Sequence, residues 1–191
     1  MRSIRAQILY LFFLSAIVIS IALSVVLFQL QRIGLLLDNL NIIYLPLAEE
    51  LSLLDTEVQQ LKQQKKIHFF EDETEKTNLN PYIKSVDKHI KRTQRLLNIQ
   101  DRFSLPDIEL MQYRTTIDQM EKINIAHGEA LSNWQQTSDY KALNTLLNSP
   151  VELSLLSNRL YVQINQKIQI LGQETATTRA QLNQISIGLS S

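Results

Sequence analysis

The chain has 191 residues, of which 19 are Lys or Arg and 19 are Asp or Glu, and it contains no cysteine. This charge balance argues against a nucleic-acid partner, which normally needs a basic surface, and the lack of cysteine excludes disulfide bonds and cysteine metal sites. With only four glycines and four prolines, the composition predicts a mainly helical protein.

The most distinctive segment is the apolar run from Ile8 to Phe28, which contains no charged residue. A run of about 20 residues is enough for a helix that crosses a bilayer core of roughly 30 Å. We therefore expect a transmembrane helix over residues 8–30, with residues 1–7 in the cytoplasm because two arginines precede the run. The alternatives are a cleaved signal peptide, whose apolar core is usually about 7–15 residues, and a buried core helix.

An apolar seam continues beyond the span and predicts a long helix. Its residues recur at alternating steps of four and three, the spacing of supercoiled helices: Ile33, Leu37, Leu40, Tyr44, Leu47, Leu51, Leu54, Val58 and Leu61. Pro46 lies inside this pattern and is expected to kink or divide the helix, because it removes one backbone hydrogen bond. The acidic run from Glu71 to Asn78 has no apolar period and is expected to be a solvated turn rather than a cation site.

The other three prolines are expected to open helices, since proline suits the first helical position. The predicted helices run from Pro81 to Gln100, from Pro106 to Trp134 and from Pro150 to about Leu189. A short helical piece from Asp139 to Leu147 is expected before the last of these. Ser149 and Glu152 fit a capping box at the start of the last helix.

Together these segments predict an all-α protein, in which an N-terminal transmembrane helix is followed by an up-down-up-down four-helix bundle with long first and last helices. The two shorter helices can cover only part of the long ones, so the membrane-proximal seams are expected to pair with a second copy. The predicted homodimer seam consists of Ile33, Leu37, Leu40, Tyr44, Leu182 and Ile185. Because the helical pattern still runs at Leu189, we expect a second transmembrane span beyond this chain.

The stretch Asn41-Ile42-Ile43-Tyr44-Leu45-Pro46-Leu47-Ala48 and the heptads around it resemble the start of the four-helix-bundle sensor domains of bacterial chemoreceptors and membrane histidine kinases. The layout of the whole chain is similar too. The resemblance implies that residues 31–191 form a dimeric, extracytoplasmic sensor domain on the bacterial inner membrane. Such a domain binds a small ligand or a periplasmic protein and transmits a helix displacement across the membrane. The ligand-contacting arginines of well-known chemoreceptors have no clear match here, so no binding residue is carried over.

Two groups of residues are candidate ligand-binding sites. Lys84, Lys88, Lys91 and Arg95 share one face of the second exterior helix and can receive an anion or an acidic partner; the plainer interpretation is a solvated face. Asn124 and His127 interrupt an apolar seam on the next helix and can line a pocket or titrate with pH. Their plainer interpretation is a hydrogen-bonded core pair that fixes helix register. No cofactor, metal or catalytic residue is expected.

The leading hypothesis is therefore the signal-input module of a bacterial transmembrane receptor, of the histidine kinase or methyl-accepting chemotaxis type. The main alternative is a single-span coiled-coil scaffold or adaptor of a cell-envelope complex. An enzyme ranks third, because no spacing of residues in the sequence supplies a nucleophile together with a base.

Overall fold

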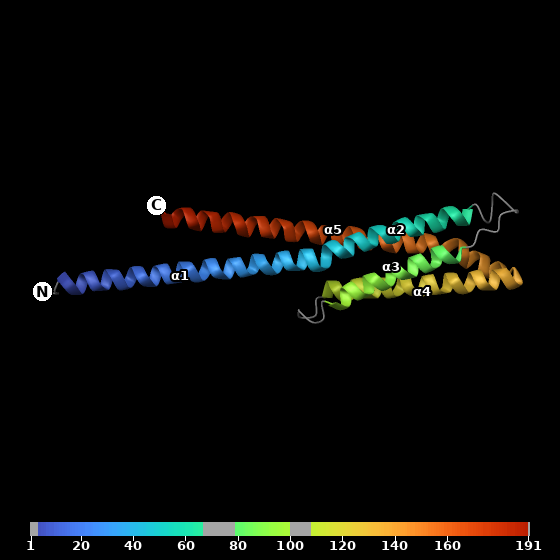
Figure 1. Cartoon of the computed structure of the whole chain (residues 1–191), viewed down its shortest axis with the longest axis horizontal. Coiled ribbons are helices and arrows are strands. Elements are labelled where there is room, and N and C mark those ends of the chain that lie inside the picture. The colour runs from blue at the N-terminus through green and yellow to red at the C-terminus, as the bar shows by residue number, and fades with distance from the viewer. Residues whose placement is uncertain (1–3, 67–78, 100–107, 191) are drawn as a thin grey trace. The chain divides into compact units, whose positions relative to one another are not determined.

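The computed structural model describes residues 4–66, 79–99 and 108–190, nearly all of which are helical (Figure 1). The helices in chain order are α1 (Ile4–Asn39), the π-helix η1 (Leu40–Tyr44), α2 (Leu45–Lys66), α3 (Asn80–Ile99), α4 (Ile108–Thr137) and α5 (Tyr140–Ser190). The described residues contain no strand, so the predicted all-α class is confirmed. The chain divides into two compact units, which we call the terminal unit (Met1–Leu40 with Gln169–Ser191) and the central unit (Asn41–Ile168).

Helix α1 contains the predicted membrane span. Within the described residues it belongs to the one stretch that is long and apolar enough to cross a membrane. Most of its large apolar side chains between Ile8 and Phe28 are exposed, and water does not tolerate an apolar surface of this size well. The apolar helix is thus confirmed. A signal sequence at the N-terminus meets the same criteria of length and composition, so the topology stays a prediction.

In the terminal unit, α1 and the C-terminal part of α5 each have a row of more buried residues with heptad spacing. The more buried positions of α1 are Ala22, Val26, Gln29, Ile33, Leu36 and Leu40, and those of α5 are Leu171, Thr175, Thr178, Leu182 and Ile185. Steps of four and three are typical of paired helices. The sequence analysis expected these seams to lack a partner within one chain, whereas the structure gathers both into one unit.

The π-helix η1 explains why the predicted seam is displaced in α1. A π turn adds one residue to the helix. The inward positions Leu36, Leu40 and Tyr44 are therefore separated by two successive steps of four, where alternating steps of three and four were expected. As a result Leu36 takes the inward position that was expected for Leu37, and Leu37 is 42% exposed. The extra residue lies just before Pro46, whose missing N–H and whose ring disturb the preceding turn. The predicted interruption near Pro46 is therefore confirmed.

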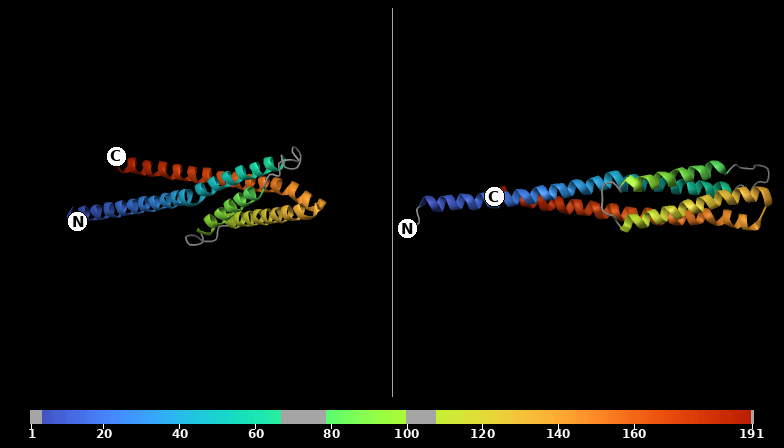
Figure 2. Two further views of the ribbon diagram at one scale, coloured as in Figure 1. Left: turned by 45° about the vertical axis from the view of Figure 1, so that its right-hand side comes forward. Right: turned by 90° about the horizontal axis from the view of Figure 1, so that it is seen from below.

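The central unit buries apolar side chains from α2, α3, α4 and the first part of α5. Helix α3 packs against both α2 and α4, and two views of the ribbon agree on these neighbours (Figure 2). Polar contacts join α5 to its two neighbours: Gln59 Nε2 of α2 donates to Ser154 Oγ at 3.1 Å, and Lys167 Nζ of α5 lies 2.7 Å from Glu109 Oε2 of α4. The four helices thus form a closed ring of contacts.

One apolar cluster in the central unit joins an end of each of these helices, and we call it the end cluster. Its buried members are Leu61, Leu79, Ala130, Leu131, Ala142 and Leu146, with Tyr82, Ile83 and Trp134 packed against it. Its members lie at the end of α2, at or just before the start of α3, at the end of α4 and at the start of α5. The end cluster therefore holds the four helices together at one end of the unit.

The predicted boundary at Pro150 is wrong. Helix α5 runs from Tyr140 to Ser190 with Pro150 inside it, so there is no separate short helix before it. Ser149 is buried and its Oγ donates to the carbonyl of Thr145 at 2.7 Å, in place of the expected capping box. The predicted starts of the other helices agree better: α3 begins one residue before Pro81, and α4 begins at Ile108. The acidic turn from Glu71 to Asn78, together with Gln100 and Pro106, lies outside the described residues.

Candidate functional site

The structure places the basic stripe on the exposed side of α3. Lys84, Lys88, Lys91 and Arg95 are all solvent-exposed. Lys91 Nζ lies 2.7 Å from Asp87 Oδ2, and the hydrogen bond and charge of Asp87, with help from the charge of Glu121, raise the pKa of Lys91. The stripe is thus flanked by carboxylates of α3 and α4, as a solvated and charge-balanced face would be. Its binding of an anion stays a prediction.

Asn124 and His127 lie in the core between helices. His127 is completely buried, and neither ring nitrogen has a hydrogen-bond partner. Asn124 Nδ2 donates to the carbonyl of Ile83 on α3 at 3.3 Å, while its buried Oδ1 has no partner. Buried polar atoms are normally paired, so three orphaned atoms on two residues of one helix mark this place as a candidate site.

Lys65 is close enough to His127 for its charge to act on the imidazole, and it was not identified by the sequence analysis. Its residue is only 7% exposed, and its Nζ donates to the carbonyls of Leu146 (3.1 Å) and Leu147 (2.8 Å) on α5. In a regular helix the carbonyl of Leu146 would accept from the N–H of residue 150, four positions later. Residue 150 is a proline and has no N–H. The lysine therefore supplies the donor that the proline lacks.

The charges of this region act on one another. Burial, and secondly the positive charge of Lys62, lower the pKa of Lys65. Burial, and secondly the positive charge of Lys65, lower the pKa of His127 to about 4. His127 is consequently neutral at pH 7, and one of its ring nitrogens carries a hydrogen while the other is an acceptor. We call Lys65, Asn124 and His127 the core polar triad.

A second polar group joins α2 to α3. The Nδ1 atom of His89 lies 2.8 Å from Glu50 Oε2, and Arg92 Nη1 donates to Glu50 Oε1 at 3.3 Å. The side chains of His89 and Glu50 are only 10% and 16% exposed. The carboxylate therefore holds two side chains of α3 at once, and its arrangement fits a structural bridge.

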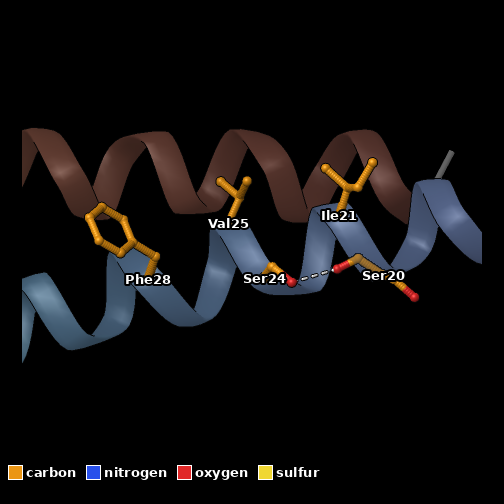
Figure 3. Close-up of a pocket in the computed structure, with 5 residues that line it drawn as sticks. All are labelled: Ser20, Ile21, Ser24, Val25 and Phe28. Carbon is orange, nitrogen blue, oxygen red and sulfur yellow. Dashed lines mark hydrogen bonds between the residues drawn. The ribbon is translucent and has the colours of Figure 1, made fainter.

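Surface depressions occur in the described part of the terminal unit. One lies along α1 within the apolar run, where Ser20, Ile21, Ser24, Val25 and Phe28 line a space of about 400 Å³ (Figure 3). Ser24 Oγ donates to the carbonyl of Ser20 there at 2.9 Å. No charged side chain borders this depression, so it offers nothing that would orient a polar ligand.

Another depression, which we call the stalk groove, lies between α1 and α5 and has a volume of about 560 Å³. Its lining residues are Val26, Leu30, Ile33, Leu37, Thr175, Arg179, Leu182 and Asn183. Three of these belong to the predicted dimer seam: Ile33, Leu37 and Leu182. Two other seam residues, Leu40 and Tyr44, are buried within the single chain, and Ile185 is partly buried. Leu37 is the seam residue that keeps the most exposed surface.

The sequence does contain a signal for the buried lysine. The core positions of α2 are Leu47, Leu51, Leu54, Val58 and Leu61, and the next step of four arrives at Lys65. A cation at a seam position predicts a specific partner, because an unpaired buried charge is costly. Pro150, four residues after Leu146, marks the carbonyl that needs a donor. Only the structure connects the two signals, because it brings Lys65 to the carbonyl of Leu146.

Within the described ranges, no group of three or more His, Asp or Glu side chains is arranged to hold a metal ion. No protein-family model, curated protein or solved structure matches the chain significantly.

Proposed function

We propose that this chain is the extracytoplasmic signal-input module of a bacterial transmembrane receptor, of the histidine kinase or methyl-accepting chemotaxis type. The observation that carries the proposal is the terminal unit, in which the continuation of an apolar helix long enough to cross a membrane lies with the end of the last helix. A signal received by the central unit can reach the membrane through either helix. A small shift between two packed helices is a well-established way to transmit such a signal.

The proposal includes an up-down-up-down bundle made of α2, α3, α4 and the first part of α5. The closed ring of helix contacts and the end cluster support it, since successive helices connected at alternating ends would produce both. An unknown small ligand or periplasmic protein is the proposed stimulus. The exposed cations at positions 84, 88, 91 and 95 would suit a multivalent anion or an acidic surface.

The proposed topology has the N-terminus in the cytoplasm and the central unit outside it, because Arg2 and Arg5 precede the apolar run. Single cysteines at Ser3 and at the exposed Thr137 test this in intact cells with a membrane-impermeant maleimide. We expect Thr137→Cys to be labelled and Ser3→Cys to be labelled only after lysis. The opposite pattern would reverse the topology. A mature protein whose mass lacks the apolar run would identify a cleaved signal sequence instead.

The alternative function is a single-span coiled-coil scaffold or adaptor of a cell-envelope complex, which the heptad seams of α1 and α5 would also suit. The coding sequence after Ser191 distinguishes the two. A second apolar run followed by a kinase or methyl-accepting region supports the receptor. A stop codon there favours the scaffold.

A further inference from the structure

The core polar triad brings one fixed positive charge close to a site that can acquire another. Lys65 of α2 is buried, and His127 of α4 is completely buried. The charge of Lys65 acts on the imidazole of His127. When His127 is neutral, the core contains one cation here. When His127 is protonated, it contains two.

Lys65 cannot easily move away from His127. Its Nζ is held by the carbonyls of Leu146 and Leu147 at 3.1 and 2.8 Å, and the first of these lacks a backbone donor because Pro150 follows four residues later. A hydrogen bond from a charged donor to such a carbonyl is worth more than a neutral one. Releasing Lys65 would also leave a buried carbonyl unpaired. The proline thus fixes the position of the charge.

No acidic side chain in the described part of the core can neutralise a second charge. Beside Lys65, α2 contributes Lys62, which is also a cation. Helix α3 presents the Ile83 carbonyl to Asn124, and its buried His89 is already held by Glu50. Helix α5 presents the carbonyls of Leu146 and Leu147, which bind Lys65. The buried polar residues of the described ranges include no Asp or Glu.

We propose that protonation of His127 opposite the fixed ammonium of Lys65 loosens the central unit at its end cluster, so that the protein responds to acid. The end cluster is the part affected because Leu146 belongs to it and Ile83 packs against it. Two cations without a counter-ion cannot remain in an apolar core without a large loss of solvation free energy. Helix separation there admits water to both. The idea that acid is a signal for the receptor rests on the proposed function. The loosening in acid does not depend on that function.

The direction of the pH effect follows from the pKa of His127, which is lowered from 6.5 to about 4 in the folded chain. The unfolded chain therefore binds a proton at His127 at a higher pH than the folded chain does. Folding stability from this group is complete above pH 6.5 and is lost as the pH falls toward 4. An extracytoplasmic domain would meet such acid, since it faces the medium.

The single tryptophan of the chain, Trp134, reports on the response because it packs against the end cluster. The experiment measures the thermal unfolding of the full chain in detergent micelles by Trp134 emission, at pH 7 and at pH 4. Other groups titrate in this range, so the loss in melting temperature is compared between variants. We expect the wild type to lose roughly 10 °C more than His127→Leu. His89→Gln is the matched control and should keep the wild-type loss, since it changes the other described buried histidine.

A second variant separates the charge from the histidine. Lys65→Met removes the cation, and Pro150→Ala in the same chain returns a backbone donor to the carbonyl of Leu146. We expect this double variant to lose fewer degrees than the wild type between pH 7 and pH 4. Equal losses in the wild type and in His127→Leu would overturn the proposal. If His127→Leu does not fold, the double variant decides: a drop in its melting temperature between pH 7 and pH 4 equal to that of the wild type overturns the proposal. Either failure leaves the topology experiment, and with it the proposed receptor, unaffected.

Discussion

Lys65 and Pro150 each offset the destabilisation that the other would cause alone. A lysine at a core position and a proline within a helix would each be destabilising alone, through desolvation of the ammonium and through a lost backbone hydrogen bond. In the structure the ammonium donates to the carbonyl that the proline leaves without a donor. The pair therefore lets α5 continue through residue 150, where the sequence pattern predicts a helix start.

A double-mutant cycle measures this dependence. Lys65→Met should destabilise the chain by about 1–3 kcal/mol, because it leaves the buried carbonyl of Leu146 unpaired. In a Pro150→Ala background the cost should be smaller, since the N–H of residue 150 can then bond to that carbonyl. Thermal or chemical unfolding of the four chains gives the coupling free energy. If Lys65→Met lowers the free energy of unfolding equally in both backgrounds, the lysine does not compensate for the hydrogen bond that Pro150 removes.

At the scale of elements, α2 and α3 are joined by a carboxylate bridge whose burial decides its importance. Glu50 is largely buried and contacts both His89 and Arg92. The pair of Lys91 and Asp87, by contrast, lies on the exposed side of α3, where solvent screens it and it links residues of one helix. Two carboxylate contacts of similar length, 2.8 Å for Glu50 with His89 and 2.7 Å for Asp87 with Lys91, should therefore contribute very differently.

Glu50→Ala and Asp87→Ala test this difference as a matched pair. We expect Glu50→Ala to cost roughly 1–3 kcal/mol, because the partly buried His89 would lose its partner. Asp87→Ala should leave the free energy of unfolding nearly unchanged, because solvent screens its pair with the exposed Lys91. Urea unfolding of both variants at pH 7 provides the two values. Similar losses in the two variants would contradict the argument from burial.

The helical class and most of the helix starts could be predicted because they depend on local patterns. The apolar run of α1, the seam of α2 and the proline near the start of α3 act within a few turns of their own helix. The errors have a different cause. Helix α5 continues through Pro150 because Lys65, on another helix, supplies the missing hydrogen bond. Leu36 takes the inward position expected for Leu37 because η1 adds one residue to the helix. A contact between distant segments decides the first, and a π turn that the spacing of apolar residues does not reveal decides the second.

The candidate site shows the same division. The sequence correctly singled out Asn124 and His127 as polar residues on an apolar seam, and both are buried. It expected the pair to be hydrogen-bonded in the plainer interpretation, but the ring of His127 has no partner. The cation that affects it could not be found from the spacing on α4. Only the packing of α2 against the other helices brings Lys65 to that place.

At the scale of the whole molecule, the stalk groove is the surface that bears on self-association. Most of the predicted seam is occupied within one chain, but Leu37 and Leu30 stay 42% and 52% exposed at the edge of the groove. Under the proposed anchoring by α1, copies in one membrane would share an orientation, and a twofold axis along the membrane normal would bring the same patch of each copy together. A second copy is therefore the proposed occupant of the stalk groove, and Arg179 would lie at the rim of the interface.

Cysteine cross-linking tests this occupant in a chain that has no native cysteine. Under mild oxidation in membranes, Leu37→Cys should form a disulfide-linked dimer faster than Leu35→Cys, because residues near a twofold axis meet their own copies. Leu35 is the matched control, since it is also an exposed leucine of α1, at 67%, and does not line the groove. A disulfide forms only when the two Cα atoms come within about 7 Å. Random collisions between copies would bring positions 35 and 37 that close about equally often, so a faster reaction at position 37 indicates a specific dimer. Negligible or equal cross-linking at both positions would remove the second copy from the groove, and the packing of α1 with α5 would then complete the stalk of a monomer.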